Sequence, residues 1–256
     1  MKRNIIVFLL LSLRFCVKAQ TDSVQLQITY AVQFKGTSKT DTIHQKDIEC
    51  LDIGRLTSHY YSLIDNWYKE HSTNTNPYVG HSLKFEVYKN MPKLGNITYI
   101  HMPGWITVIE KNDQLFNWNL VAGDSTICDY LCKKAITDFR GRKWTVWYTL
   151  DIPNSDGPWK FCGLPGLVLK ATDNDQNFDF TCIGINRAKA KKISYPSNAK
   201  HIVSAERADE LQQLEQKDFT AYMNLLLAGQ VVIREIKTQG NSRKNHPQMP
   251  SLELFK

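Results

Sequence analysis

The sequence lacks an apolar run long enough for a permanent membrane-spanning helix. Such a helix needs roughly 20 consecutive apolar residues. The apolar segment Ile5–Leu13 is shorter, and the charged residues Arg14 and Lys18 follow it. No later segment is long and apolar enough either. The sequence therefore predicts no transmembrane helix after the N-terminal segment.

Motifs of several catalytic and metal-binding classes are also missing. The chain has no Cys-x-x-Cys pair, P-loop, dinucleotide-binding glycine fingerprint, Gly-x-Ser-x-Gly elbow or His-Glu-x-x-His motif. Residues 173–179 space oxygen ligands as a calcium loop does, but Phe178 stands where that loop requires glycine. The sequence thus assigns no catalytic residue, no cofactor and no metal ligand.

Linkers rich in proline, glycine or serine are absent, and so are internal repeats. A chain of this length forms one large β domain or two small ones. Without a linker we expect a single β-rich domain over residues 20–239. Polar residues dominate from Gly240 onward, so residues 240–256 are expected to form a flexible tail.

The N-terminus does contain the pattern of a signal peptide. Basic Lys2 and Arg3 precede the apolar segment, and Val17 and Ala19 fit the positions that a signal peptidase recognises. We expect cleavage after Ala19, which makes residues 1–19 a signal peptide. The expected location is the periplasm or the outer membrane surface, with secretion as the alternative.

The charge of the chain argues against nucleic acid as a partner. Residues 1–19 contain four basic and no acidic side chains, so their removal lowers the formal net charge from +7 to +3. Nucleic-acid binding requires a clustered basic face. The one local basic cluster, Arg187–Lys192, is expected to be a solvated strand edge or loop.

Five cysteines remain after cleavage: Cys50, Cys128, Cys132, Cys162 and Cys182. An exported protein can form disulfides, and an odd number leaves at least one thiol over. Cys128 and Cys132 are about 13 Å apart on an extended strand, too far to bond to each other. In a hairpin around Gly141, Cys132 comes opposite Leu150, and the loop that follows leads back toward it. We therefore predict a Cys132–Cys162 disulfide.

Short apolar segments with a period of two residues dominate the rest of the chain. Residues 24–34 alternate without interruption, as a half-buried strand does. Further strands are predicted over residues 48–53, 83–87, 97–101, 106–110, 115–120, 131–139, 143–149, 167–172 and 178–185. Such a series predicts a mainly β fold. We expect a curved antiparallel sheet or open half-barrel packed on a long C-terminal helix, with a β-sandwich as the alternative.

That C-terminal helix is predicted from residue 204 to residue 228. Ser204 suits an N-cap, apolar residues recur at helical spacing, and Gly229 follows the end. The helix is amphipathic, and we expect it to pack on the sheet. A shorter helix is expected over residues 63–70.

The most unusual segment is Gly157–Val168. Pro165 and Gly166 suit the central positions of a type II turn. One interpretation is a tight entry of the chain into the core. The other is a backbone cradle or docking surface with Trp159 and Phe161 as aromatic anchors. The candidate binding residues are Gly157, Pro158, Trp159, Phe161, Gly163, Leu164, Pro165, Gly166, Leu167 and Val168.

This segment resembles the signature of the GLPGLI family. Residues 163–168 read Gly-Leu-Pro-Gly-Leu-Val, with valine where the family has isoleucine, and residues 132–135, 139–142 and 147–153 agree as well. The resemblance implies an exported protein of a Gram-negative bacterial group, often encoded beside outer-membrane transport components. It implies no established activity, no catalytic residues and no cofactor.

Three functions remain open. The first is a non-enzymatic envelope protein that binds a partner or ligand in support of outer-membrane transport. The second is a carrier of an apolar molecule, which requires an apolar pocket of roughly 300 Å³ or more. The third is an envelope enzyme that uses a cysteine, such as Cys162, or an acidic pair, which requires titratable groups converging in a cleft.

Overall fold

The computed structural model describes residues 21–38, 41–71, 83–101, 106–113, 115–187, 191–196, 200–227 and 251–254. The signal peptide expected over residues 1–19 lies outside these ranges. Among the described residues, no helix has the length and apolar character needed to cross a membrane.

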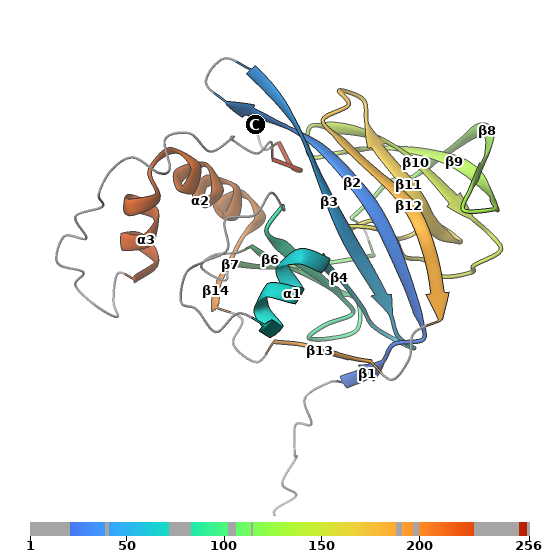
Figure 1. Cartoon of the computed structure of the whole chain (residues 1–256), viewed down its shortest axis with the longest axis horizontal. Coiled ribbons are helices and arrows are strands. Elements are labelled where there is room, and N and C mark those ends of the chain that lie inside the picture. Colours follow the sequence, from blue (N-terminus) through green and yellow to red (C-terminus); the bar gives the residue numbers. More distant parts are fainter. Residues whose placement is uncertain are drawn as a thin grey trace, which may run out of the picture.

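A curved, unclosed sheet of twelve strands makes up most of the described chain (Figure 1). Its order is β14-β7-β6-β5-β4-β3-β2-β12-β11-β10-β9-β8. The strands are β2 (Leu26–Ser38), β3 (Asp41–Ile53), β4 (Ser58–Ser62), β5 (Phe85–Lys89), β6 (Asn96–His101), β7 (Ile106–Lys111), β8 (Asn119–Ile127), β9 (Tyr130–Phe139), β10 (Arg142–Thr149), β11 (Leu167–Asp173), β12 (Phe178–Arg187) and β14 (Lys200–Val203). Neighbours pair antiparallel, except β14, which runs parallel to β7. The predicted curved sheet is thereby confirmed.

Two short strands and three helices complete the fold over the described residues. β1 (Thr21–Ser23) pairs with β13 (Lys192–Ser194), and α1 (Leu63–His71) follows β4 directly. α2 (Ala205–Lys217) and α3 (Phe219–Leu227) lie together at one end of the curved sheet, and β8 to β12 lie at the other (Figure 1). α2 and α3 cover β7, with Val108, Ala208 and Tyr222 buried between them.

The C-terminal helix is two helices, not the single long one that the periodicity predicts. Ser204 does cap α2, since its side chain accepts the Arg207 N–H at 3.2 Å. The break comes at Asp218, whose backbone leaves the helical conformation. The Asp218 carboxylate accepts the Ala221 N–H at 3.0 Å and so begins α3.

One face of the sheet, here called the inner face, holds the main core. On β2, Ile28, Tyr30, Val32 and Phe34 point to this face and are at most 2% exposed, as the alternation over residues 24–34 predicts. Burial of each such side chain stabilises the fold by about 1.5–3 kcal/mol. The inner face is therefore where a covering segment must pack.

The C-terminal segment 251–254 packs on the fold, although the sequence predicts a flexible tail over residues 240–256. Leu252 is buried, and the Leu254 N–H donates to the Arg140 carbonyl at 2.8 Å. The Arg142 guanidinium donates to the Ser251 carbonyl at 2.7 and 2.9 Å. These contacts fix the segment, because they satisfy backbone groups that a solvated tail would leave to water.

Candidate functional site

Most of the residues singled out by the sequence lie in the loop between β10 and β11, here called the motif loop (residues 150–166), whereas Leu167 and Val168 begin β11. It crosses the inner face, and its middle part, residues 156–162, is buried. Of the ten candidate binding residues, eight are buried, whereas Gly163 and Pro165 are exposed. The exposed side of the loop, here called the crest, consists of Leu150, Asp151, Pro153, Ser155, Gly163 and Pro165.

The loop does not form the type II turn that is predicted at Pro165 and Gly166. Gly166 does not adopt a left-handed conformation, so that prediction is wrong. It is required for close approach instead, because a Cβ there would lie 1.9 Å from the Thr149 carbonyl oxygen. Gly163 is the left-handed residue, with φ of +91°, and its N–H donates to Ser155 Oγ at 2.8 Å.

A buried lysine holds the loop from beneath. Lys89 on β5 donates to the Gly157 carbonyl at 2.7 Å and to the Phe161 carbonyl at 2.8 Å. It also forms an ion pair with Asp156, and both side chains are at most 9% exposed. All three ammonium donors thus have acceptors on one loop, which ties the loop to β5.

The aromatic residues of the loop belong to the core. The ring centroid of Trp144 on β10 lies 5.7 Å from that of Trp159 and 5.0 Å from that of Phe161. Trp159 and Phe161 are themselves 5.2 Å apart in an edge-to-face arrangement. All three are fully buried. They anchor the loop to the sheet and are not available to contact a partner.

Four charged side chains form a ring beside Trp159, here called the charge ring: Glu110, Arg140, Lys160 and Glu253. The Lys160 ammonium lies 2.7 Å from a Glu110 oxygen and also contacts Glu253. Arg140 contacts the same two carboxylates. Lys160 is only 2% exposed. The ring therefore joins β7, the motif loop and the C-terminal segment.

The two cations of the ring favour the charged form of Glu110. Desolvation alone would raise the pKa of Glu110, but Lys160 and Arg140 hold that pKa below its ordinary value. Lys160 also lies over the Tyr99 ring, 5.1 Å from its centroid. With every member paired, the ring acts as a structural clamp.

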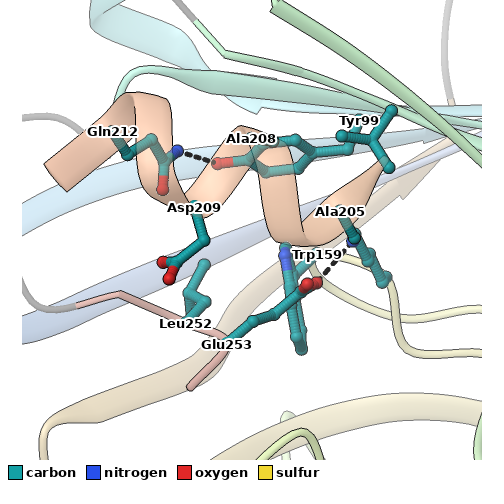
Figure 2. A pocket seen from close by; sticks show the side chains of 10 residues that line it. Tyr99, Trp159, Ala205, Ala208, Asp209, Gln212, Leu252 and Glu253 are labelled. Atoms are coloured by element: carbon teal, nitrogen blue, oxygen red, sulfur yellow. Dashed lines mark hydrogen bonds and ion pairs between the residues drawn. The ribbon is translucent and has the colours of Figure 1, made fainter. Parts of the chain in front are cut away.

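A small pocket lies between α2, Trp159 and the C-terminal segment (Figure 2). Gln212 on α2 donates to the Tyr99 hydroxyl at 3.0 Å across one side of it. Its volume is about 20 Å³, which accommodates a single water molecule. This pocket does not provide the volume that an apolar carrier needs.

Three polar side chains on β3 lie in phase with the buried apolar ones and form an acidic row: Gln45, Asp47 and Glu49 are at most 5% exposed. One oxygen of each acid and both amide atoms of Gln45 have no hydrogen-bond partner among the described residues. Burial raises the pKa of Asp47 to about 6 and that of Glu49 well above its ordinary value. Asp47 and Glu49 are therefore an acidic pair in which burial favours the protonated form.

The opposite face of the sheet carries a second polar cluster around His59. The His59 ring stacks on Tyr88 at 4.1 Å and on Tyr61 at 4.6 Å between centroids. Its Nε2 atom lies 3.1 Å from a Glu86 oxygen. Burial lowers the pKa of His59 to about 3, so the ring is neutral near pH 7.

Among the described residues, no group of three or more His, Cys, Asp or Glu side chains is placed to hold a metal ion.

The predicted disulfide is not formed in this structure. Cys132 and Cys162 are both free thiols, and Cys132 Sγ lies 3.5 Å from the Tyr130 carbonyl. Burial raises the pKa of each thiol to about 11. The sulfur atoms that do meet are those of Cys128 and Cys182, 3.4 Å apart.

Sequence reasoning found the motif loop but missed the charges that hold it. Asp156 directly precedes the motif and Lys160 lies within it. Two charged residues in an otherwise apolar and glycine-rich segment could have indicated that charges hold the loop. Their partners come from distant positions, such as Glu253, 93 residues away from Lys160. The acidic row had a signal too, because Gln45, Asp47 and Glu49 continue the alternation of Leu51 and Ile53.

Residues 140–170 match a family described as a protein of unknown function (Porph_ging). The matched residues include Arg140, Trp159, Lys160 and Gly166, so the match covers the second half of the β9–β10 hairpin and the motif loop. No curated protein matches the chain.

Solved structures were found to be similar to this chain at low sequence identity, and one of them has a TM-score above 0.5. PNGF-II in one crystal form is 17% identical with a TM-score of 0.51, over 75% of this chain and 33% of that chain. A second crystal form of PNGF-II is 17% identical with a TM-score of 0.46, over 72% of this chain and 32% of that chain. A DUF1329 family protein from Desulfovibrio piger ATCC 29098 is 7% identical with a TM-score of 0.24, over 64% of this chain and 86% of that chain. The chain therefore spans about a third of PNGF-II, and the likeness concerns the fold alone.

Proposed function

We propose that this chain is an exported, non-enzymatic binding protein of the bacterial cell envelope and a member of the GLPGLI family. Its location is the periplasm or the outer membrane surface. Its partner is a protein component of outer-membrane transport, which docks on the crest of the motif loop. The match of residues 140–170 to a family of unknown function supports the family assignment, since it includes most of the motif.

One observation carries the binding role: the motif loop is braced from beneath and exposed above. Lys89 and the charge ring hold its buried side, and Leu150 on the crest is 52% exposed. A loop that is already ordered loses little conformational entropy when a partner binds. Rigid scaffolds that present such loops are a common arrangement for binding.

Charge substitution on the crest tests this proposal. Pro165→Asp places a carboxylate on the crest, and Leu94→Asp is a matched control at a 72% exposed position in the β5–β6 turn. We expect Pro165→Asp to abolish co-purification of the envelope partner and Leu94→Asp to retain it. Tryptophan fluorescence verifies that both variants fold. Equal recovery of the partner with both variants would overturn the assignment of the crest.

A second candidate, an envelope enzyme with an acid/base site, is favoured by the acidic row. Asp47 and Glu49 share one face of β3, each has an oxygen without a hydrogen-bond partner among the described residues, and the pKa of Asp47 is about 6. General acids with such values work near neutral pH. If Asp47→Asn or Glu49→Gln abolishes an activity of the purified protein while its unfolding curve is retained, this candidate replaces the first. A cysteine mechanism is disfavoured, because burial raises the pKa of Cys162 to about 11.

A further inference from the structure

The turn between β8 and β9 brings together two cysteines that the sequence keeps apart. Cys128 and Asp129 form this turn with φ of 48° and 66°, as in a two-residue hairpin loop. The turn directs Cys128 Sγ to 3.4 Å from Cys182 Sγ and 3.1 Å from the Cys182 carbonyl. Cys182 lies on β12, which the sheet order separates from β9 by β10 and β11. The curl of the sheet, not a strand ladder, produces this contact.

We propose that Cys128 and Cys182 form an intramolecular disulfide in the exported protein. The proposal rests on export to an oxidising compartment and not on the binding role of the crest. A disulfide bond is about 2.05 Å long, so the two sulfur atoms must approach by about 1.4 Å.

The chemistry needs an external oxidant, which is a disulfide of an oxidoreductase or of a small thiol such as glutathione. The Cys128 thiolate attacks that disulfide, and one thiolate leaves with an electron pair. Cys182 then loses its proton to solvent, attacks Cys128 Sγ and expels the second thiolate. Two protein thiols become one disulfide, and the oxidant disulfide becomes two thiols.

The environments of the two thiols set this order. Cys128 is half-buried, whereas Cys182 is 3% exposed. Burial and the neighbouring Cys128 raise the pKa of Cys182 to about 12. Cys128 is therefore the first to react. The product links the edge hairpin β8–β9 to the centre of the sheet and leaves Cys50, Cys132 and Cys162 as thiols.

Disulfide mapping on the exported chain, from which the expected signal peptide with Cys16 has been removed, tests the proposal. The purified, reduced protein is incubated with oxidised glutathione, quenched with acid, unfolded, alkylated and digested with trypsin and chymotrypsin. Chymotrypsin is needed because Tyr130 and Leu131 separate Cys128 from Cys132. We expect an intact mass lower by two hydrogens and a linked peptide pair that contains Cys128 and Cys182.

Two variants complete the experiment. Cys50→Ser is the matched control and must retain the Cys128–Cys182 link, whereas Cys128→Ser must leave every remaining cysteine alkylated. Alkylation of all five cysteines in the oxidised wild type would overturn the proposal, and so would a Cys132–Cys162 link. The wild-type map decides between these results even if Cys128→Ser fails to fold.

Discussion

Replacement of Lys160 by methionine removes the ammonium group of the charge ring and keeps most of the aliphatic stem. In the wild type, that ammonium contacts Glu110 and Glu253 and is 2% exposed. The variant leaves two half-buried carboxylates with Arg140 as their shared cation. The expected result is a loss of stability together with release of the C-terminal segment.

The structure sets the size of this loss. Removal of one partner from a buried ion pair lowers the free energy of unfolding by about 3–5 kcal/mol. Since Arg140 still compensates both carboxylates, the lower end applies, and we expect about 3 kcal/mol. The matched control is Lys170→Met. Lys170 pairs with Asp179 at 3.3 Å, with both side chains at least 34% exposed, and such surface pairs contribute less than about 1 kcal/mol.

Urea denaturation followed by tryptophan fluorescence measures both variants. With a slope of about 3 kcal/mol per molar, the midpoint of Lys160→Met falls by about 1 M and that of Lys170→Met barely moves. A double variant with Glu253→Gln should lose less stability than the sum of the single losses, because one of the two carboxylates that share Arg140 is then gone. Equal losses for the two lysine variants, or strict additivity, would refute the clamp role of the ring.

Three further outcomes are expected. Burial raises the pKa of Asp47 from 3.8 to about 6 in the folded state, so folding takes up a proton, and the free energy of unfolding falls as the pH rises between about 4 and 6. Asp47→Asn should remove this pH dependence. In urea titrations at pH 7 the variant should have a free energy of unfolding higher by up to about 3 kcal/mol. Gly166→Ala should prevent folding or lower the thermal midpoint sharply, because the new Cβ would lie 1.9 Å from the Thr149 carbonyl oxygen. Gly184→Ala is the control and should leave the thermal midpoint nearly unchanged, because the nearest atom to its Cβ would be 3.9 Å away. Reduction of a Cys128–Cys182 disulfide, which closes a 54-residue separation, should lower stability by about 4 kcal/mol; no difference between oxidised and reduced protein in calorimetry would contradict this value.

Local patterns accounted for much of the fold. The alternation over residues 24–34 predicted a half-buried strand because side chains on a strand repeat every two residues. Ser204 predicted a helix start because its oxygen accepts a backbone N–H three residues on. The break at Asp218 escaped the same reasoning, since the aspartate competes with the helix through its own side chain and the apolar period continues past it.

Contacts between distant segments could not be predicted from these patterns. The charge ring joins Glu110, Arg140, Lys160 and Glu253, which share no local periodicity. The pairing of Cys128 with Cys182 depends on how far the sheet curls between β12 and β9, which local patterns do not give. Sheet geometry allows several partners for each cysteine, so the spacing of residues alone favoured Cys132–Cys162 over the pair that the fold brings together.

Photocrosslinking from the crest tests the binding role most directly. A photoreactive amino acid is placed at position 165 on the crest, or at position 94 as an equally accessible control, and cells producing the full chain are irradiated. The proposal predicts one discrete envelope protein, a component of outer-membrane transport, crosslinked from position 165 and absent from position 94. The same crosslinks from both positions, or none from position 165 in cells whose envelope contains the protein, would contradict it.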